Sequence, residues 1–239
     1  MALQPNLRRT TISRSAANVD EGLRQYMLGI YTYMGFGVLL TGLVSYFIGT
    51  NERLLLSLFS SQGMMYLLMF LPVGIALWLN LGINRIKAST AQLLFWVYAA
   101  LIGVALAPIF VLYTDTSIAK AFFIAATMFG GMSLYGYTTQ KDLSGIGSFL
   151  IMGVWGLFVA MIVNIFLRSS GLDFLISIVA VLVFTGLTAY ETQLAKASYQ
   201  EDEAGEITKK KSIIFALQLY INFINMFIHL LRLMNSNRN

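Results

Sequence analysis

The sequence predicts an all-α integral membrane protein that folds as one bundle of seven transmembrane helices. Of its 239 residues, 57% are apolar and only 11% are charged, and the mean hydropathy is +0.72. A soluble domain carries about 25% charged residues, so this chain has too few charges to cover a globular surface. Its apolar runs also reach the length of about 20 residues that a helix needs to cross the hydrocarbon core.

The predicted spans form a single transmembrane domain over residues 26–234, without an internal repeat. A polar, basic tail of residues 1–25 precedes it, and residues 235–239 form a short C-terminal tail. The N-terminal tail lacks the apolar core of a secretory signal. We therefore expect it to be disordered or to lie on the membrane surface, with the first span as an uncleaved anchor. The spans are expected at residues 26–48, 62–82, 89–113, 117–137, 144–167, 174–192 and 213–234.

The lysine and arginine residues predict the orientation. If the N-terminus is inside, eleven basic residues fall on the cytoplasmic side and five fall outside. Because basic residues concentrate in cytoplasmic loops, we expect a cytoplasmic N-terminus, an outer C-terminus and a cytoplasmic loop from Glu201 to Lys211. For the last span, a re-entrant hairpin is the alternative to a full crossing.

Local signals agree with a helical bundle. Ser144 and Asp173 are placed to cap the fifth and sixth spans, and Pro108 is expected to kink the third span near its outer end. The third span also carries small residues at intervals of four, which allow a neighbouring helix to approach closely. These residues are Ala99, Gly103 and Ala107.

The composition excludes several classes of site. The chain has no cysteine, which rules out disulfides and thiolate metal sites. Its net charge of +5 comes from basic residues scattered between apolar runs, so these residues predict topology and no nucleic-acid partner. The chain has one histidine, His229, and a lone histidine without a carboxylate cluster does not indicate a zinc site.

The last span carries a polar ridge on one helix face. Its members follow one another at steps of four, three, four and three residues, which places them on one side of a helix. A polar ridge on an apolar helix must face other helices or water. We expect this ridge to point into the bundle and the other faces of the helix to contact lipid. The ridge comprises Gln218, Asn222, Asn225, His229 and Arg232.

Glu191 is the one carboxylate within an apolar span, at the cytoplasmic end of the sixth span. It is either a helix-end acid that reaches interfacial water or a buried gate or ion site. The sixth and seventh spans run antiparallel, which can set Glu191 against Gln218 or Asn222. The alternative role for Gln218 and Asn225 is helix packing through hydrogen bonds.

Ser133 in the fourth span and His229 in the seventh are the residue types of an intramembrane serine protease. Such a pair needs direct hydrogen-bond contact. Ser133 is expected near the inner end of its span and His229 near the outer end of its own. We therefore expect no enzyme.

Four strings give the chain a resemblance to the Bax inhibitor 1 family, in its bacterial branch, over essentially all residues from Gly22 onward. A further string, GLRQYM, precedes the first span. The four strings are SLYGYTTQKDLSG (133–145), VNIFL (163–167), GLTAYETQ (186–193) and LYINFINMF (219–227).

This resemblance implies a pH-sensitive passive leak channel for calcium in the cell inner membrane. It also implies a sensor formed by two aspartates and an arginine, at the positions of Glu191, Asn222 and, less directly aligned, Arg85. The remaining ridge residues Gln218, Asn225 and His229 would line the ion pathway. Calcium would be the transported ion, and no cofactor is expected.

Two of the three sensor positions depart from the family pattern. Two close carboxylates cannot both ionise comfortably, whereas an amide at residue 222 does not repel Glu191. The pH gate is therefore expected to be displaced or absent. Glu191 alone would make a weak calcium site, because calcium prefers six to eight oxygen ligands. The alternative is a non-conducting membrane protein that modulates stress responses or a membrane-bound protease.

Overall fold

The computed structural model describes residues 6–201, 203 and 205–236, and every regular element in this part of the chain is a helix. Seven helices are long and apolar enough to cross a membrane, as predicted. The elements are α1 (Asn6–Gly49), α2 (Glu52–Phe59), α3 (Gln62–Gly82), η1 (Ile83–Arg85), α4 (Ala88–Leu106), α5 (Ile109–Leu112), α6 (Asp115–Thr138), α7 (Ser144–Leu167), α8 (Ser170–Ala197) and α9 (Gly205–Ser236).

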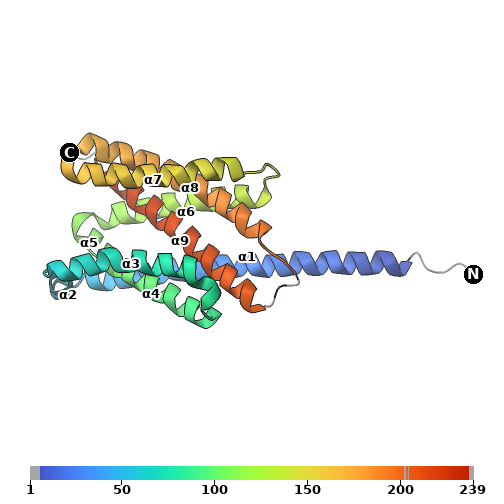
Figure 1. Ribbon diagram of the computed structural model, residues 1–239. Helices are drawn as coiled ribbons and strands as arrows, with labels where there is room; N and C mark the ends of the chain where they lie inside the picture. The colour runs from blue at the N-terminus through green and yellow to red at the C-terminus, as the bar shows by residue number, and fades with distance from the viewer. Residues whose placement is uncertain (1–5, 202, 204, 237–239) are drawn as a thin grey trace, which may run out of the picture.

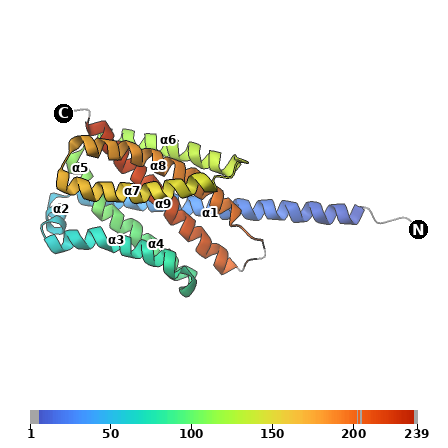
Figure 2. The ribbon, with the colours of Figure 1, turned by 45° about the horizontal axis from the view of Figure 1, so that its top comes forward.

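The bundle consists of two groups of helices with α9 between them. One group contains α1, α3 and α4, and the other contains α6, α7 and α8 (Figures 1 and 2). Helix α9 packs against α1 and α4 on one side and against α6 and α8 on the other. It is a single continuous helix of 32 residues, about 48 Å long at the usual rise per residue, which fits a full crossing.

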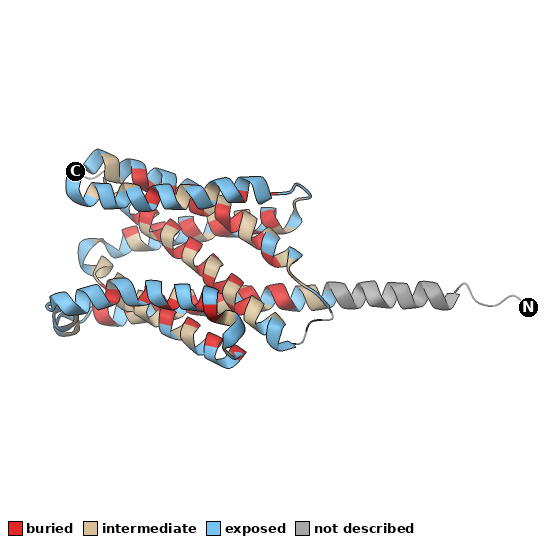
Figure 3. Ribbon diagram, in the orientation of Figure 1, coloured by how far each residue is buried: buried red, intermediate tan, exposed pale blue. Residues whose placement is uncertain are grey.

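The expectation that α9 faces lipid on its apolar sides is wrong. About 67% of its apolar window is buried inside the bundle, against 6% for α7 (Figure 3). Lipid tails are as apolar as leucine. Hydropathy therefore does not distinguish a helix surrounded by protein from one that faces the bilayer. Residues with almost no exposure cover most of the circumference of α9 and include Ile213, Leu217, Tyr220, Met226 and Leu231. The least buried stripe of the helix runs through Gln218, Asn225 and Arg232 of the polar ridge.

Tyr220 joins three helices at the centre of the bundle. Its hydroxyl lies 2.6 Å from Oγ1 of Thr41 on α1, and Thr41 Oγ1 donates to the Ala99 carbonyl of α4 at 2.8 Å. A methyl group on Gly103 of α4 would lie 2.8 Å from the Thr41 carbonyl. The predicted small-residue face of the third span therefore packs against α1.

The third predicted span is interrupted where a kink was expected. Helix α4 ends at Leu106, and α5 begins after Pro108. Proline has no amide hydrogen and clashes with the preceding turn, so the α-helical ladder stops there.

Two helix caps differ from the prediction. Ser144 is the first residue of α7, and its amide donates to Asp142. Helix α8 begins one turn earlier than expected, because Ser169 caps it by accepting from the Leu172 amide. Asp173 consequently lies in the first turn of α8.

The N-terminal tail is helical from Asn6 onward, so of the two expected states disorder is wrong and a position on the membrane surface stays a prediction. After Pro5 this stretch contains no proline, and it has four arginines, which favour helices. The predicted tails also include residues 1–5 and 237–239, which lie outside the described residues.

Candidate functional site

Glu191 and Asn222 meet at the contact between α8 and α9. Asn222 Nδ2 donates a hydrogen bond to Glu191 Oε2 at 2.7 Å, and Asn222 is buried. Glu191 lies six residues before the end of α8, about 9 Å along the helix axis. The acid is therefore bonded to the neighbouring helix α9, at one of the two positions that the antiparallel order of the spans allowed.

Gln218 lies one helical turn before Asn222 on α9, and its Oε1 atom is buried without a hydrogen-bond partner among the described residues. An unpaired buried amide oxygen costs free energy. Gln218 lies on the same face of α9 as Asn222, because residues four apart are neighbours on a helix. The ridge thus offers an unused oxygen ligand one turn from the Glu191–Asn222 contact.

Hydroxyl groups connect the neighbouring helices beside Glu191. Ser133 on α6 lies 3.1 Å from Thr192 on α8, Oγ to Oγ1, and accepts from the Tyr31 hydroxyl of α1 at 3.2 Å. Ser133 therefore does not pair with His229. Sequence reasoning missed Tyr31 and Thr192, although Thr192 directly follows the acid in the string GLTAYETQ.

The rest of the polar ridge lies farther along α9. Asn225 donates to the Ile221 carbonyl of its own helix at 2.8 Å, so it does not reach a neighbour through this bond. His229 is buried, and its Nδ1 lies 3.3 Å from Oγ of Ser177 on α8. At the end of the ridge, Arg232 pairs with the predicted cap residue Asp173 at 3.6 Å. Pattern reasoning did not identify Ser177, because a serine in an apolar span has many possible partners.

Arg85 does not join this group. It is exposed in η1, at the connection between α3 and α4, and among the described residues it forms no ion pair with Glu191. The arginine–acid contact that the family resemblance implies is therefore absent in this arrangement.

Gln193, one residue after Thr192, fixes the connection between α6 and α7. Its Oε1 accepts from the Leu143 amide at 2.9 Å, and its Nε2 donates to the Lys141 carbonyl at 2.8 Å. Within the same connection, hydrogen bonds from the Ser144 hydroxyl and amide lower the pKa of Asp142 from its ordinary value. These contacts bring two of the strings, 133–145 and 186–193, together in the fold.

The side chains at the Glu191–Asn222 contact carry carboxylate and amide oxygens, which are possible ligands for a cation. The described residues contain no group of three or more His, Asp or Glu side chains that can hold a metal ion. Calcium takes six to eight oxygens, which exceeds what Glu191, Asn222 and Gln218 supply. These three side chains therefore do not by themselves complete a calcium coordination shell.

Comparison with known proteins gives a consistent set of relatives. A family described as inhibitor of apoptosis-promoting Bax1 matches residues 23–239. The chain is 44% identical to an uncharacterised protein of Rickettsia prowazekii, over 96% of each chain. It is 42% identical to an uncharacterised protein of Caulobacter vibrioides, over 94% of each chain. It is 38% identical to the inner membrane protein YbhL of Escherichia coli K12, over 95% of this chain and 97% of that one.

Proposed function

Because the chain belongs to the family of inhibitors of apoptosis-promoting Bax1, we propose that it is a multi-pass inner-membrane protein that leaks cations passively. Calcium is the expected ion, and the leak is expected to respond to pH. The membrane assignment rests on the seven apolar helices and on the inner-membrane relative YbhL.

One observation carries this proposal: the Glu191 carboxylate lies inside the bundle on the central helix pair, bonded to Asn222 at 2.7 Å. A carboxylate at membrane depth is costly unless it has a partner, and such groups commonly mark ion pathways. The unpartnered Gln218 oxygen one turn away adds a second ligand facing the same helix contact.

Glu191 acts as the gate in this mechanism. While its carboxylate is ionised, it accepts from the Asn222 amide and holds α8 against α9. Protonation at low pH removes the charge that strengthens this hydrogen bond. The contact between the two helices then loosens, and a cation can exchange water for the amide oxygens.

The test is calcium flux into liposomes that contain the purified protein, measured against pH. Glu191→Gln should flatten the pH dependence of the flux, while Glu52→Gln, which removes an exposed acid of α2, should leave it unchanged. A pH response that persists in Glu191→Gln would remove this residue from the mechanism and direct attention to His229.

Asn222→Asp provides a second measurement on the same site. Two carboxylates this close repel each other when both are ionised, so the response should steepen between acid and neutral pH. Flux of divalent ions should also rise, because calcium favours several charged ligands. Additive effects of Asn222→Asp and Glu191→Gln in the double variant would mean that the two residues act separately.

The orientation is tested in the naturally cysteine-free chain. We expect a cysteine at Lys209, just after the α8–α9 loop, to be labelled from the cytoplasmic side and one at Glu52 from the outer side. Labelling of both by an impermeant reagent added to one side would contradict seven crossings.

The alternative is a non-conducting protein that binds a membrane partner such as a protease. The packing of α9 favours it, since residues at 0–2% exposure recur from Ile213 to Leu231 and leave little room along the central helix. Under this alternative, liposomes with wild-type protein would leak no faster than protein-free liposomes. Partner contact would then be sought by crosslinking from α7, the least buried of the seven helices.

A further inference from the structure

A groove of about 470 Å³ lies between η1 and the first turns of α9, beside the α8–α9 loop. Three polar side chains line it: Asn84, Lys210 and Lys211. The Ala88 amide at the start of α4 donates to Glu206 Oε1 at 3.3 Å, which holds the first turn of α9 against this corner of the bundle (Figures 1 and 2). The rest of the lining is an apolar wall of Ile83, Ile207, Ile214 and Phe215.

Lys210 is the basic residue of the groove whose charge the protein uses least. Lys211 pairs with Glu203 and also donates to the Ser198 carbonyl at 2.9 Å. Lys210 Nζ lies 3.7 Å from Glu206 Oε1, which is too far for a hydrogen bond, and that oxygen already accepts from the Ala88 amide. An ammonium has three donors, so Lys210 keeps donors for a ligand in the groove.

The burial of Lys210 separates it from lysines that only set topology. A lysine that serves topology alone can extend into water, whereas only 17% of the Lys210 side chain is exposed. The side chain thus places a positive charge next to the apolar wall of the groove. A ligand that matches this arrangement carries a negative charge joined to an apolar chain.

The surroundings of the groove are positively charged. Residues 83–88 and 203–211 contain five basic side chains and two acids. Arg85, Lys87 and Lys209 are exposed and form no ion pair among the residues that the structure describes. One span ends and two begin at this corner, so the groove lies near the depth of the lipid head groups.

We propose that this groove binds an anionic phospholipid. Lys210 pairs with the phosphate, Asn84 donates an amide N–H to it, and one acyl chain lies along the apolar wall. Basic pockets between transmembrane helices are a known type of site for acidic head groups. A zwitterionic lipid would bring its own ammonium among these basic residues, and like charges repel. The bilayer supplies the ligand, so the site requires no soluble partner.

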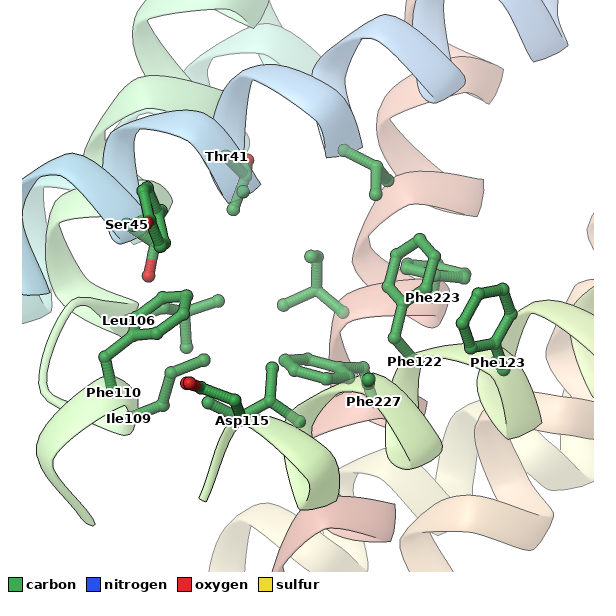
Figure 4. A pocket seen from close by; sticks show the side chains of 16 residues that line it. Thr41, Ser45, Leu106, Ile109, Phe110, Asp115, Phe122, Phe123, Phe223 and Phe227 are labelled. Atoms are coloured by element: carbon green, nitrogen blue, oxygen red, sulfur yellow. The ribbon is translucent and has the colours of Figure 1, made fainter. Parts of the chain in front are cut away.

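A second space in the bundle shows what the charges add. A cavity of about 370 Å³ beside Ser45 of α1 is lined mainly by apolar side chains, and none of its described lining residues is basic (Figure 4). Contact between an acyl chain and such a lining does not depend on the charge of the head group. A preference for anionic lipid therefore distinguishes binding in the groove from general apolar binding.

The experiment is native mass spectrometry of the full-length protein with equimolar phosphatidylglycerol, phosphatidylethanolamine and phosphatidylcholine of identical acyl chains. We expect phosphatidylglycerol to be retained about threefold to fivefold over the other two, because one partly exposed basic residue contributes modestly. Equal retention of all three lipids would overturn the proposal. An excess of glycerol phosphate, which has the charge without the acyl chains, should not displace the lipid. Displacement would overturn the role of the apolar wall.

Variants identify the residues responsible. Lys210→Gln should remove most of the preference for phosphatidylglycerol, while Lys120→Gln, which changes an exposed lysine of α6, should leave it unchanged. Glu206→Gln keeps an acceptor for the Ala88 amide and removes the negative charge beside Lys210, so retention of phosphatidylglycerol should rise.

Two outcomes would overturn this assignment: a preference that persists in Lys210→Gln, or retention that falls in Glu206→Gln. Circular dichroism of each variant checks that the helices remain folded. Binding is measured without ion flux and does not involve Glu191, so its failure would not bear on the proposed leak.

Discussion

Gly136 of α6 provides the sharpest test of how the helices around Glu191 are held together. A methyl group at this position would lie 2.8 Å from the carbonyl carbon and 2.9 Å from Cα of Ala189, and would collide with the carbonyl oxygen. All three atoms belong to the α8 backbone, so no side-chain rotation relieves the overlap. Gly136→Ala must therefore push α6 away from α8, near the Ser133–Thr192 hydrogen bond.

The expected magnitude follows from two opposing effects. Overpacking costs about 1–3 kcal/mol, and contact with rigid backbone favours the upper end. Replacing glycine by alanine within a helix stabilises the fold by up to about 1 kcal/mol. Gly136→Ala should therefore lower the free energy of unfolding by about 2 kcal/mol.

Gly131 on the same helix is the matched control, because nothing lies within 4 Å of a methyl group placed there. Gly131→Ala should keep or raise stability by up to about 1 kcal/mol. The two variants should then differ by about 3 kcal/mol, or roughly 6–12 °C in Tm for a chain of this size. Thermal unfolding in detergent, followed by circular dichroism, measures this difference. Equal Tm values for the two variants would refute the close α6–α8 contact.

Three further outcomes follow from the contacts. Gln193→Ala should speed amide exchange at residues 139–143, because both bonds that hold this connection are lost, while Gln200→Ala in an exposed turn should not. Tyr220→Phe removes the hydroxyl that joins α1 to α9 and should cost about 0.5–1.5 kcal/mol of stability in a denaturation titration, since one hydrogen bond is lost while Thr41 keeps its bond to the Ala99 carbonyl. The folded-state pKa of Asp142 is lowered, so the stability that its hydrogen bonds to Ser144 provide is present at neutral pH. This stability is lost as the pH falls below the ordinary pKa of 3.8. The protection factor of the Ser144 amide, taken against the intrinsic exchange rate at each pH, should fall with this loss, and Asp142→Asn should remove that fall.

The sequence alone was sufficient to predict the class of fold and the helix order. Apolar runs such as 62–82 and 144–167 coincide with α3 and α7, because only a helix satisfies every backbone polar group inside a bilayer. The polar ridge was also correctly placed on one helix, since the period of 3.6 residues is local information. The approach of Glu191 to Asn222 followed from the antiparallel order of two neighbouring spans.

Only the tertiary structure decided which helix is central and which polar groups meet. Lipid and protein are equally apolar neighbours, so the burial of most of α9 could not be predicted from its composition. Arg85 and Glu191 are separated because their helices end in different groups of the bundle, and no periodicity encodes that arrangement. The pairing of His229 with Ser177, and the cavity beside Ser45, depend on how separate helices pack together. Such contacts join residues far apart in the chain, so the pattern of residues within any one helix does not predict them.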